Sequence, residues 1–183
     1  YKDNLALLED IYLKYLDLHG DEDQDGEFLA GLFCRDPDFL YCYLDKALDH
    51  MGTSFYAHNS WASRLHFVWD DETFQSYPEL ISDYLFEKTG EEEWRYSAII
   101  SQLLLCKNED SDIVAKRQNA WILHTIEMHA AEPTRMHYLF GAISESSADR
   151  RKIALEKFLK LNDDYALFEK LPLESPSIGG IGS

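Results

Sequence analysis

Basic residues are scarce in this chain, which has 17 Lys and Arg against 34 Asp and Glu and a formal net charge of −17 at pH 7. A surface of this charge repels the phosphate backbone of a nucleic acid and an anionic membrane surface. We therefore expect no nucleic-acid partner and no membrane partner. The partner that this charge favours is a protein segment carrying Lys or Arg.

Cysteine is also rare, and the three present, Cys34, Cys42 and Cys106, form no CxxC pair. This count argues against a disulfide scaffold and a thiolate zinc site, and it favours a cytoplasmic location. Cys34 and Cys42 lie among apolar residues, which predicts buried, unreactive thiols. No apolar run approaches the ~18 residues of a membrane-spanning helix.

Linear motifs of catalysis and cofactor binding are missing too. The sequence contains no GxxxxGK[ST], GxGxxG or GxSxG segment. In "HTIEMH", His124 and His129 are five residues apart, so a helix would place them on different faces rather than around one zinc ion. We expect no metal site and no cofactor, and no residue can be assigned a catalytic role.

Strand signals are weak, because valine occurs only twice and no hairpin dipeptide separates alternating apolar runs. Apolar residues instead recur with the period of a helix almost throughout, which predicts an all-α protein. The helices are expected at 3–20, 27–34, 36–52, 60–70, 78–88, 91–107, 111–131, 134–144, 148–161 and 164–170.

Several helix ends are marked by capping residues. Asp36 and Pro37 are suited to the N-cap and first position of one helix, and Ser147 is suited to the N-cap of another. Gly90 is expected to end the helix that Pro78 opens. The helix after Asp36 carries the clearest apolar stripe, formed by Phe39, Leu40, Tyr43, Leu44, Ala47, Leu48 and Met51.

Three segments, "FLYCYLDKAL", "ELISDYLFEK" and "WILHTIEMHA", begin 40 and then 42 residues apart, and a shorter helix precedes each. In this respect the chain, over roughly 24–161, resembles HEAT-like or armadillo-like helical repeats. The resemblance implies antiparallel helix pairs stacked as a short α-solenoid. An irregular helical bundle would give a similar period and is the alternative.

The expected domain organisation is one helical-repeat domain over 1–173 and a C-terminal tail or linker over 174–183. The chain does not begin with Met, and its last residues, "PSIGGIGS", contain no closing element. We therefore expect it to be a segment of a longer protein.

The segment "DEDQDGEF" has the beginning of an EF-hand loop, with Asp21, Asp23 and Asp25 at alternate positions and Gly26 at the sixth. The twelfth position, which supplies a bidentate carboxylate in EF-hands, is Leu32. We expect an acidic turn in which Asp25 caps the following helix, with the three aspartates as a weak cation candidate only.

Aromatic residues crowd two of the predicted helices. They either belong to the core or form an exposed apolar surface that binds a partner. If they form such a surface, the partner-binding candidates are Tyr41, Trp61, Phe67 and Trp69.

The functional expectation is a non-catalytic interaction, scaffold or regulatory module of a larger cytoplasmic, bacterial protein. The partner would be a basic protein segment or another domain of the same chain. By architecture it is similar to the helical-repeat part of a STAND-type NTPase. The alternative is an all-α enzyme whose histidines and carboxylates meet only in space.

Overall fold

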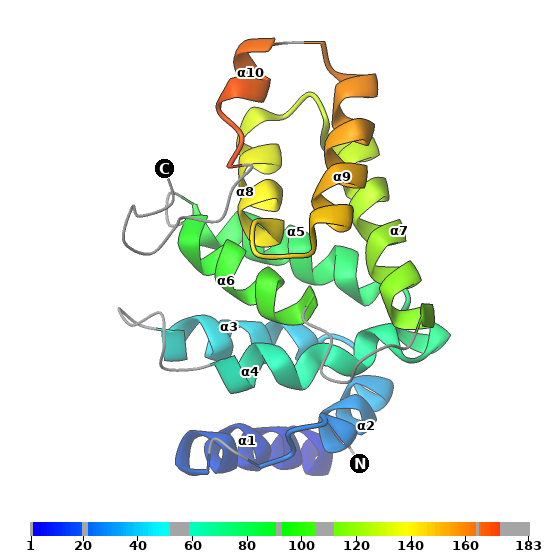
Figure 1. Ribbon diagram of the computed structural model, residues 1–183. Coiled ribbons are helices and arrows are strands. Elements are labelled where there is room, and N and C mark those ends of the chain that lie inside the picture. The colour runs from blue at the N-terminus through cyan, green and yellow to red at the C-terminus, as the bar shows by residue number, and fades with distance from the viewer. Residues whose placement is uncertain are drawn as a thin grey trace, which may run out of the picture. The chain divides into compact units, whose positions relative to one another are not determined.

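A computed structural model describes residues 2–19, 22–51, 59–90, 93–104, 112–163 and 165–172, and every regular element within these ranges is helical (Figure 1). This confirms the all-α prediction. In chain order the elements are α1 (Lys2–Leu18), α2 (Glu27–Arg35), α3 (Phe39–Met51), α4 (Asn59–Ser63), the 3₁₀ helices η1 (Arg64–Trp69) and η2 (Glu72–Phe74), α5 (Tyr77–Thr89), α6 (Glu93–Leu104), α7 (Asp112–His129), α8 (Pro133–Ile143), α9 (Ala148–Leu161) and α10 (Tyr165–Glu169).

The chain divides into two compact units, which we call the N-terminal unit (Tyr1–Glu87) and the C-terminal unit (Lys88–Ser183). The boundary falls in the last turn of α5, so most of that helix belongs to the N-terminal unit. The predicted repeat domain, 1–173, would cover both units. The predicted tail at 174–183 lies outside the described residues.

The core of the N-terminal unit forms around α3. Its predicted apolar stripe is confirmed for the six side chains from Phe39 to Leu48, each at most 8% exposed. The ring of Phe33 on α2 lies at the centre of an aromatic cluster, with ring centroids 5.6 Å from Tyr77, 5.9 Å from Phe67 and 6.0 Å from Phe39. Such tilted ring pairs stabilise the core beyond the burial of their area.

The single α-helix predicted over 60–70 is wrong in part. A short α-helix, α4, passes directly into the 3₁₀ helix η1, in which five of six residues are buried. An α-helix would keep Trp61, Leu65, Val68 and Trp69 on one side, but here Arg64 and Phe67 are buried as well. Neighbouring elements thus enclose the segment on most sides, which the sequence pattern alone does not show.

The start of α3 also differs from the prediction. Asp36 is the C-cap of α2, and α3 begins three residues later, at Phe39. The Oδ1 atom of Asp36 accepts a hydrogen bond from the Asp38 amide at 3.2 Å, so its carboxylate stabilises the turn between the two helices.

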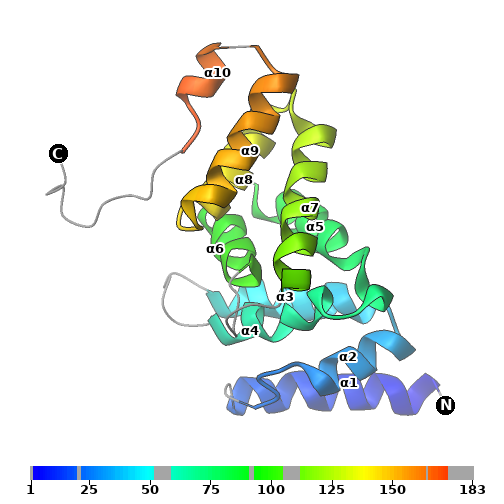
Figure 2. The same cartoon turned by 45° about the vertical axis from the view of Figure 1, so that its right-hand side comes forward.

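In the C-terminal unit the most extensive helix contacts join alternate helices, α6 with α8 and α7 with α9. Figures 1 and 2 show α7 and α9 side by side in both views. Contacts of this kind are expected in a stack of helix pairs, but irregular bundles contain them too. The choice between a solenoid and a bundle therefore stays a prediction.

Two predicted caps of these helices are confirmed. The Ser147 side chain accepts a hydrogen bond from the Arg150 amide at 3.2 Å and is the N-cap of α9. Gly90, with a φ of +53°, follows the last residue of α5.

Arg150 connects three helices of the C-terminal unit. Its guanidinium donates to Gln118 Oε1 at 2.7 Å, to Asn119 Oδ1 at 2.9 Å and to the Leu104 carbonyl at 3.3 Å. Gln118 is fully buried, so the charged guanidinium of Arg150 satisfies a side-chain acceptor inside the unit.

Within the described residues, no helix combines the length and the apolar character that crossing a membrane requires.

Candidate binding surface on helix α1

The acidic turn before α2 is built as a helix cap. The two carboxylate oxygens of Asp23 accept from the Phe28 and Leu29 amides, both at 3.1 Å, and Oδ2 also accepts from the Tyr12 hydroxyl at 2.6 Å. These contacts satisfy two of the free amides at the start of α2. Asp23 is thus committed to the protein itself rather than available to a cation.

The prediction that Asp25 caps α2 is wrong. Asp25 is exposed, the N-cap position is taken by Gly26, and the capping carboxylate comes from Asp23, where the backbone turns through a φ of +49°. Asp21, the remaining cation candidate, lies outside the described residues. Leu32, at the twelfth position of the loop pattern, is 2% exposed and belongs to the core.

The same turn is held against η1 by backbone contacts. The Glu22 carbonyl accepts from Arg64 Nε at 3.0 Å, and Gly26 approaches so closely that a Cβ there would lie 2.1 Å from the Arg64 carbonyl oxygen. Only glycine fits, because the φ of Gly26 is +69° as well.

Arg64 is fully buried and surrounded by aromatic side chains. Its Nη1 donates to the Tyr43 hydroxyl at 3.3 Å, and its guanidinium carbon lies 5.8 Å from the ring centroid of Trp61. The Tyr43 hydroxyl in turn donates to the Trp61 carbonyl at 2.6 Å. Burial raises the pKa of Tyr43, although the nearby Arg64 acts in the opposite direction, so the phenol stays neutral.

Helix α1 packs against this framework with only a narrow face. From Asn4 to Leu18 only Tyr12 and Leu16 are buried. On a different face, four large apolar side chains are exposed: Leu7 (57%), Ile11 (52%), Tyr15 (45%) and Leu18 (80%). They follow one another at spacings of four, four and three, so they form one continuous stripe of the helix.

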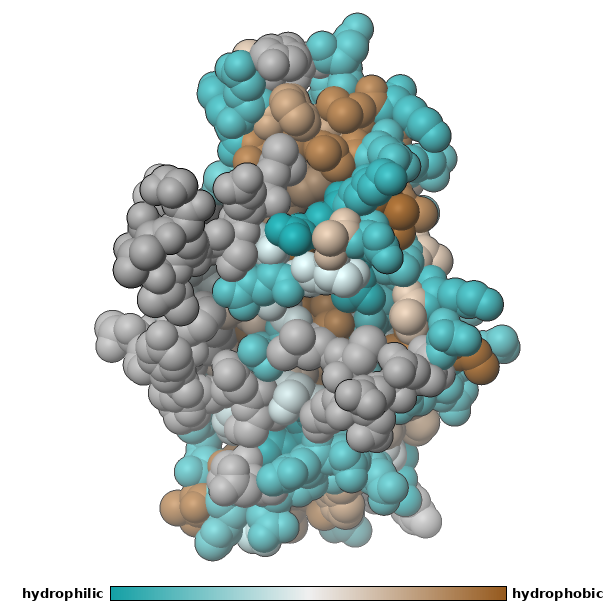
Figure 3. Space-filling view, viewed as in Figure 1, coloured by the Kyte–Doolittle hydropathy of each residue, from teal (hydrophilic) through white to brown (hydrophobic). Residues whose placement is uncertain are grey.

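The apolar residues of α1 are thus divided between two faces. Tyr12 and Leu16 are buried, whereas Ile11 and Tyr15, one residue earlier in each case, are exposed. In Figure 3, brown hydrophobic residues lie among teal ones along the edge where α1 runs. We call Leu7, Ile11, Tyr15, Leu18 and the neighbouring Phe28, which is 49% exposed, the α1 face.

A groove of about 370 Å³ lies beside the stripe, between α1 and the start of α2. Its apolar lining is supplied by Leu8, Ile11, Tyr12, Tyr15 and Phe28, and its acidic lining by Glu22 and Asp23. Within this lining Phe28 stacks on Tyr12, with ring centroids 5.5 Å apart. The groove is therefore apolar with an acidic edge.

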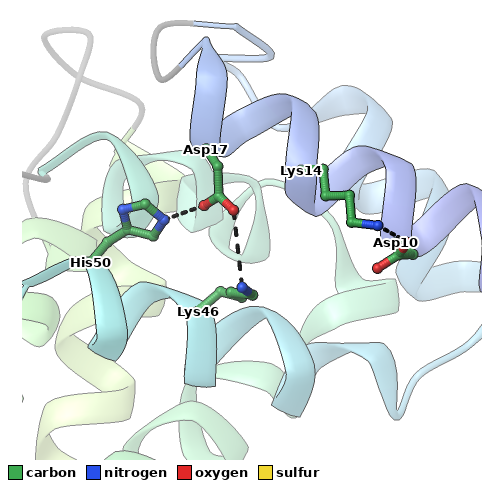
Figure 4. A network of polar contacts seen from close by, with 5 residues as sticks. All are labelled: Asp10, Lys14, Asp17, Lys46 and His50. Carbon is green, nitrogen blue, oxygen red and sulfur yellow. Dashed lines mark hydrogen bonds and ion pairs between the residues drawn. The ribbon is translucent and has the colours of Figure 1, made fainter.

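Polar contacts also join α1 to α3. Asp17 accepts from His50 Nε2 and forms a 3.9 Å ion pair with Lys46, and both partners are on α3 (Figure 4). The other pair in Figure 4, Lys14 with Asp10 at 2.8 Å, lies within α1 and is exposed. Contacts to α3 thus orient the helix, and its apolar stripe stays uncovered.

Negative charge is concentrated in the N-terminal unit. Residues 1–87 contain five Lys and Arg against nineteen Asp and Glu, a formal net charge of −14, whereas residues 88–183 contain twelve against fifteen, a net charge of −3. The α1 face therefore lies on the unit that carries most of the chain's charge.

One carboxyl group of this unit titrates unusually. Burial, together with the carboxylate of Asp36, raises the pKa of Glu9 to about 7. Its Oε1 atom is buried and has no hydrogen-bond partner in the described structure. Glu9 lies on the packed side of α1, so a negative charge on its carboxylate disfavours the packing of α1 against the rest of the unit.

The prediction of buried cysteines is wrong for Cys34 and Cys42, which are both exposed. Their helices bury the faces that carry Phe33 and Tyr43 instead. Partial desolvation and nearby carboxylates, Asp45 first among them, raise the pKa of Cys42. The exposed thiol of Cys42 is therefore a poorer nucleophile than a free cysteine.

Most of the predicted partner-binding aromatics are buried and do not belong to the α1 face. Trp61, Phe67 and Trp69 are each at most 8% exposed and form part of the core of the N-terminal unit. Tyr41 alone is partly exposed, and its ring lies 4.9 Å from that of Tyr84. Sequence reasoning missed Leu7, Ile11 and Leu18, although one signal was available: apolar residues cover more than one face of the first helix.

No group of three or more His, Cys, Asp and Glu side chains is arranged to hold a metal ion in the described ranges. His124 is exposed, and His129 contacts Glu132 through Nδ1.

Comparison with known proteins gave no match for the chain among family models, curated proteins or solved structures.

Proposed function

We propose that this chain is a non-catalytic protein-binding module of a cytoplasmic protein, and that it binds a basic, amphipathic helix of its partner along the α1 face. The observation that carries the proposal is the stripe of exposed Leu7, Ile11, Tyr15 and Leu18 on a helix that buries only two side chains between Asn4 and Leu18. Exposed apolar patches of this kind are typical of interaction sites.

The shape of the surface favours a helix as the binding element. The stripe follows the axis of α1, and the groove beside it lies between two helices rather than at the end of a sheet. An amphipathic helix inserts apolar side chains at i, i+3 or i+4 and i+7 into such a groove. The described residues offer no strand whose edge a β-strand could extend.

Charge selects among the possible helices. Glu22 supplies a carboxylate at the edge of the groove, beside the capping Asp23, and the unit as a whole carries a net charge of −14. A second copy of the same unit would bring like charges together, whereas Lys or Arg beside the partner's apolar face would be attracted. The binding element is therefore a basic helix, from another protein or from another domain of the same chain.

The apolar contacts supply most of the affinity. Full burial of a Leu or Ile side chain contributes roughly 1.5–3 kcal/mol, and Leu7, Ile11 and Leu18 are each more than half exposed before binding. Electrostatic attraction adds association rate and specificity, and salt weakens it.

A designed peptide tests the proposal directly. The probe is a fluorescent helix with Leu at the positions of one face and Lys beside them. It is compared with a scrambled peptide of the same composition and with a version that has Glu in place of Lys. Binding to the full chain is measured by fluorescence anisotropy at low and at moderate salt.

Two protein variants localise the site. Substitution I11S removes apolar surface from the α1 face, whereas I113S removes it from α7, where Ile113 is 59% exposed. We expect I11S to weaken the Lys peptide by roughly tenfold, the equivalent of about 1.4 kcal/mol, and I113S to leave binding unchanged. Equal binding of the scrambled peptide, or equal effects of the two substitutions, would show that the α1 face is not a specific site.

A further inference from the structure

The C-terminal unit contains a pocket that is independent of the α1 face. It has a volume of about 240 Å³ and lies between α8, the first half of α9 and Pro172, three residues after the end of α10. Its lining is apolar apart from two cations: Phe140, Ile143, Ala148, Leu155 and Pro172 accompany Arg151 and Lys152.

The two cations are not engaged by the described part of the chain. Arg151 and Lys152 make no side-chain hydrogen bond or ion pair with the described residues, and Arg151 Nε is buried without an acceptor. A buried N–H group without an acceptor is costly, and an anion beside Arg151 Nε would remove that cost.

We propose that this pocket binds a small amphiphilic carboxylate. The guanidinium of Arg151 presents a planar set of donors that matches a carboxylate, and Lys152 adds a second positive charge. The apolar lining receives a short hydrocarbon body. Pockets for drug-sized ligands measure ~300–1,000 Å³, so about 240 Å³ fits a smaller molecule, of the size of a medium-chain fatty acid.

The local charge supports an anion at this place. Helix α9 carries five basic residues against two acidic ones, although the chain as a whole is strongly acidic. Its basic residues outside the pocket are already engaged in part: Arg150 binds Gln118 and Asn119, and Lys157 pairs with Glu127 at 3.6 Å. Arg151 and Lys152 are the basic residues of α9 that line the pocket, whereas Lys160 lies at the exposed far end of the helix.

The test uses three probes on the full chain: octanoate, 1-octanol and acetate. Octanoate carries the charged head and the apolar body, and each of the other two lacks one of them. Methyl NMR titration follows Ile143, Ala148 and Leu155, and isothermal calorimetry gives the dissociation constants. We expect octanoate to shift these methyl signals and to bind more tightly than either other probe.

Variants separate the pocket from general attraction. R151Q removes the guanidinium, and K160Q removes one charge from the exposed far end of α9 as a matched control. We expect R151Q to weaken octanoate by roughly tenfold without affecting octanol, and K160Q to change neither. A148F, at an exposed position of the lining, should block octanoate and octanol alike.

Several outcomes would overturn the proposal. Equal affinity for octanoate and octanol would mean that the cations contribute nothing, and equal losses in R151Q and K160Q would mean that only net charge matters. Methyl shifts confined to other regions, or no shift at millimolar octanoate, would exclude the pocket as the site. Circular dichroism of each variant confirms that it is folded, and I11S should bind octanoate as the unmodified chain does.

Discussion

Gly26 should not tolerate even an alanine. In G26A the new Cβ would lie 2.1 Å from the Arg64 carbonyl oxygen and 2.6 Å from the Phe67 ring, and both neighbours are buried. The acidic turn must therefore lift away from η1. That movement would take the Glu22 carbonyl from Arg64, which is fully buried and has this carbonyl as an acceptor.

The magnitude follows from two separate costs. An alanine held at a φ of +69° costs roughly 1–2 kcal/mol relative to glycine, and overpacking of a filled site costs roughly 1–3 kcal/mol. We expect G26A to lower the free energy of unfolding by about 2–5 kcal/mol, a large part of the ~5–15 kcal/mol that a domain possesses.

Urea unfolding followed by tryptophan fluorescence measures this effect, because Trp61 and Trp69 lie in the same unit. The matched control is G31A, five residues further on in α2, where a Cβ would meet nothing within 4 Å. Alanine favours a helix over glycine, so G31A should raise stability by roughly 0.5–1 kcal/mol. If G26A left the midpoint unchanged, or G31A were equally damaging, the close approach of the turn to η1 would be refuted.

Three further predictions concern side chains. D23A removes three hydrogen bonds and should cost about 2–3 kcal/mol in urea unfolding, whereas D25A should change stability by less than about 0.5 kcal/mol. Because the pKa of Glu9 is raised in the folded state to about 7, its stabilising contribution is complete below pH 4.5 and is lost as the pH rises through 7. E9Q should therefore raise the melting temperature at pH 8 but not at pH 4, and an equal effect at both would contradict the assignment. R150A removes the hydrogen bonds to Gln118, Asn119 and the Leu104 carbonyl and should cost about 2–4 kcal/mol, measured as loss of amide-exchange protection in α9; unchanged protection would count against it.

The sequence predicted those parts of the fold in which local pattern and tertiary environment agree. The apolar stripe of α3 and the Ser147 cap follow from spacing and from the preference of serine for an N-cap. In both cases the chain near the residue determines its environment, so no knowledge of distant segments is needed.

The remaining features depend on contacts that are distant in sequence. The carboxylate of Asp23 is preferred over that of Asp25 because Tyr12, eleven residues earlier, donates to it. The 3₁₀ helix η1 is enclosed by the turn and by α2 and α3, which no periodicity in 60–70 reveals. The candidate site was missed for a related reason. When a helix has apolar residues on two faces, its sequence does not indicate which face the fold will cover.

The uneven distribution of charge gives added salt two opposite effects on the same unit. With nineteen carboxylates and five basic side chains, residues 1–87 repel themselves, and ions that shorten the Debye length to ~8 Å at physiological strength relieve this repulsion. Salt should thus make the isolated unit more resistant to unfolding. The same ions would weaken the proposed binding of a basic helix to the α1 face. A rise in ionic strength should therefore increase the stability of this unit and decrease its affinity for a basic helix, so the two properties change in opposite directions.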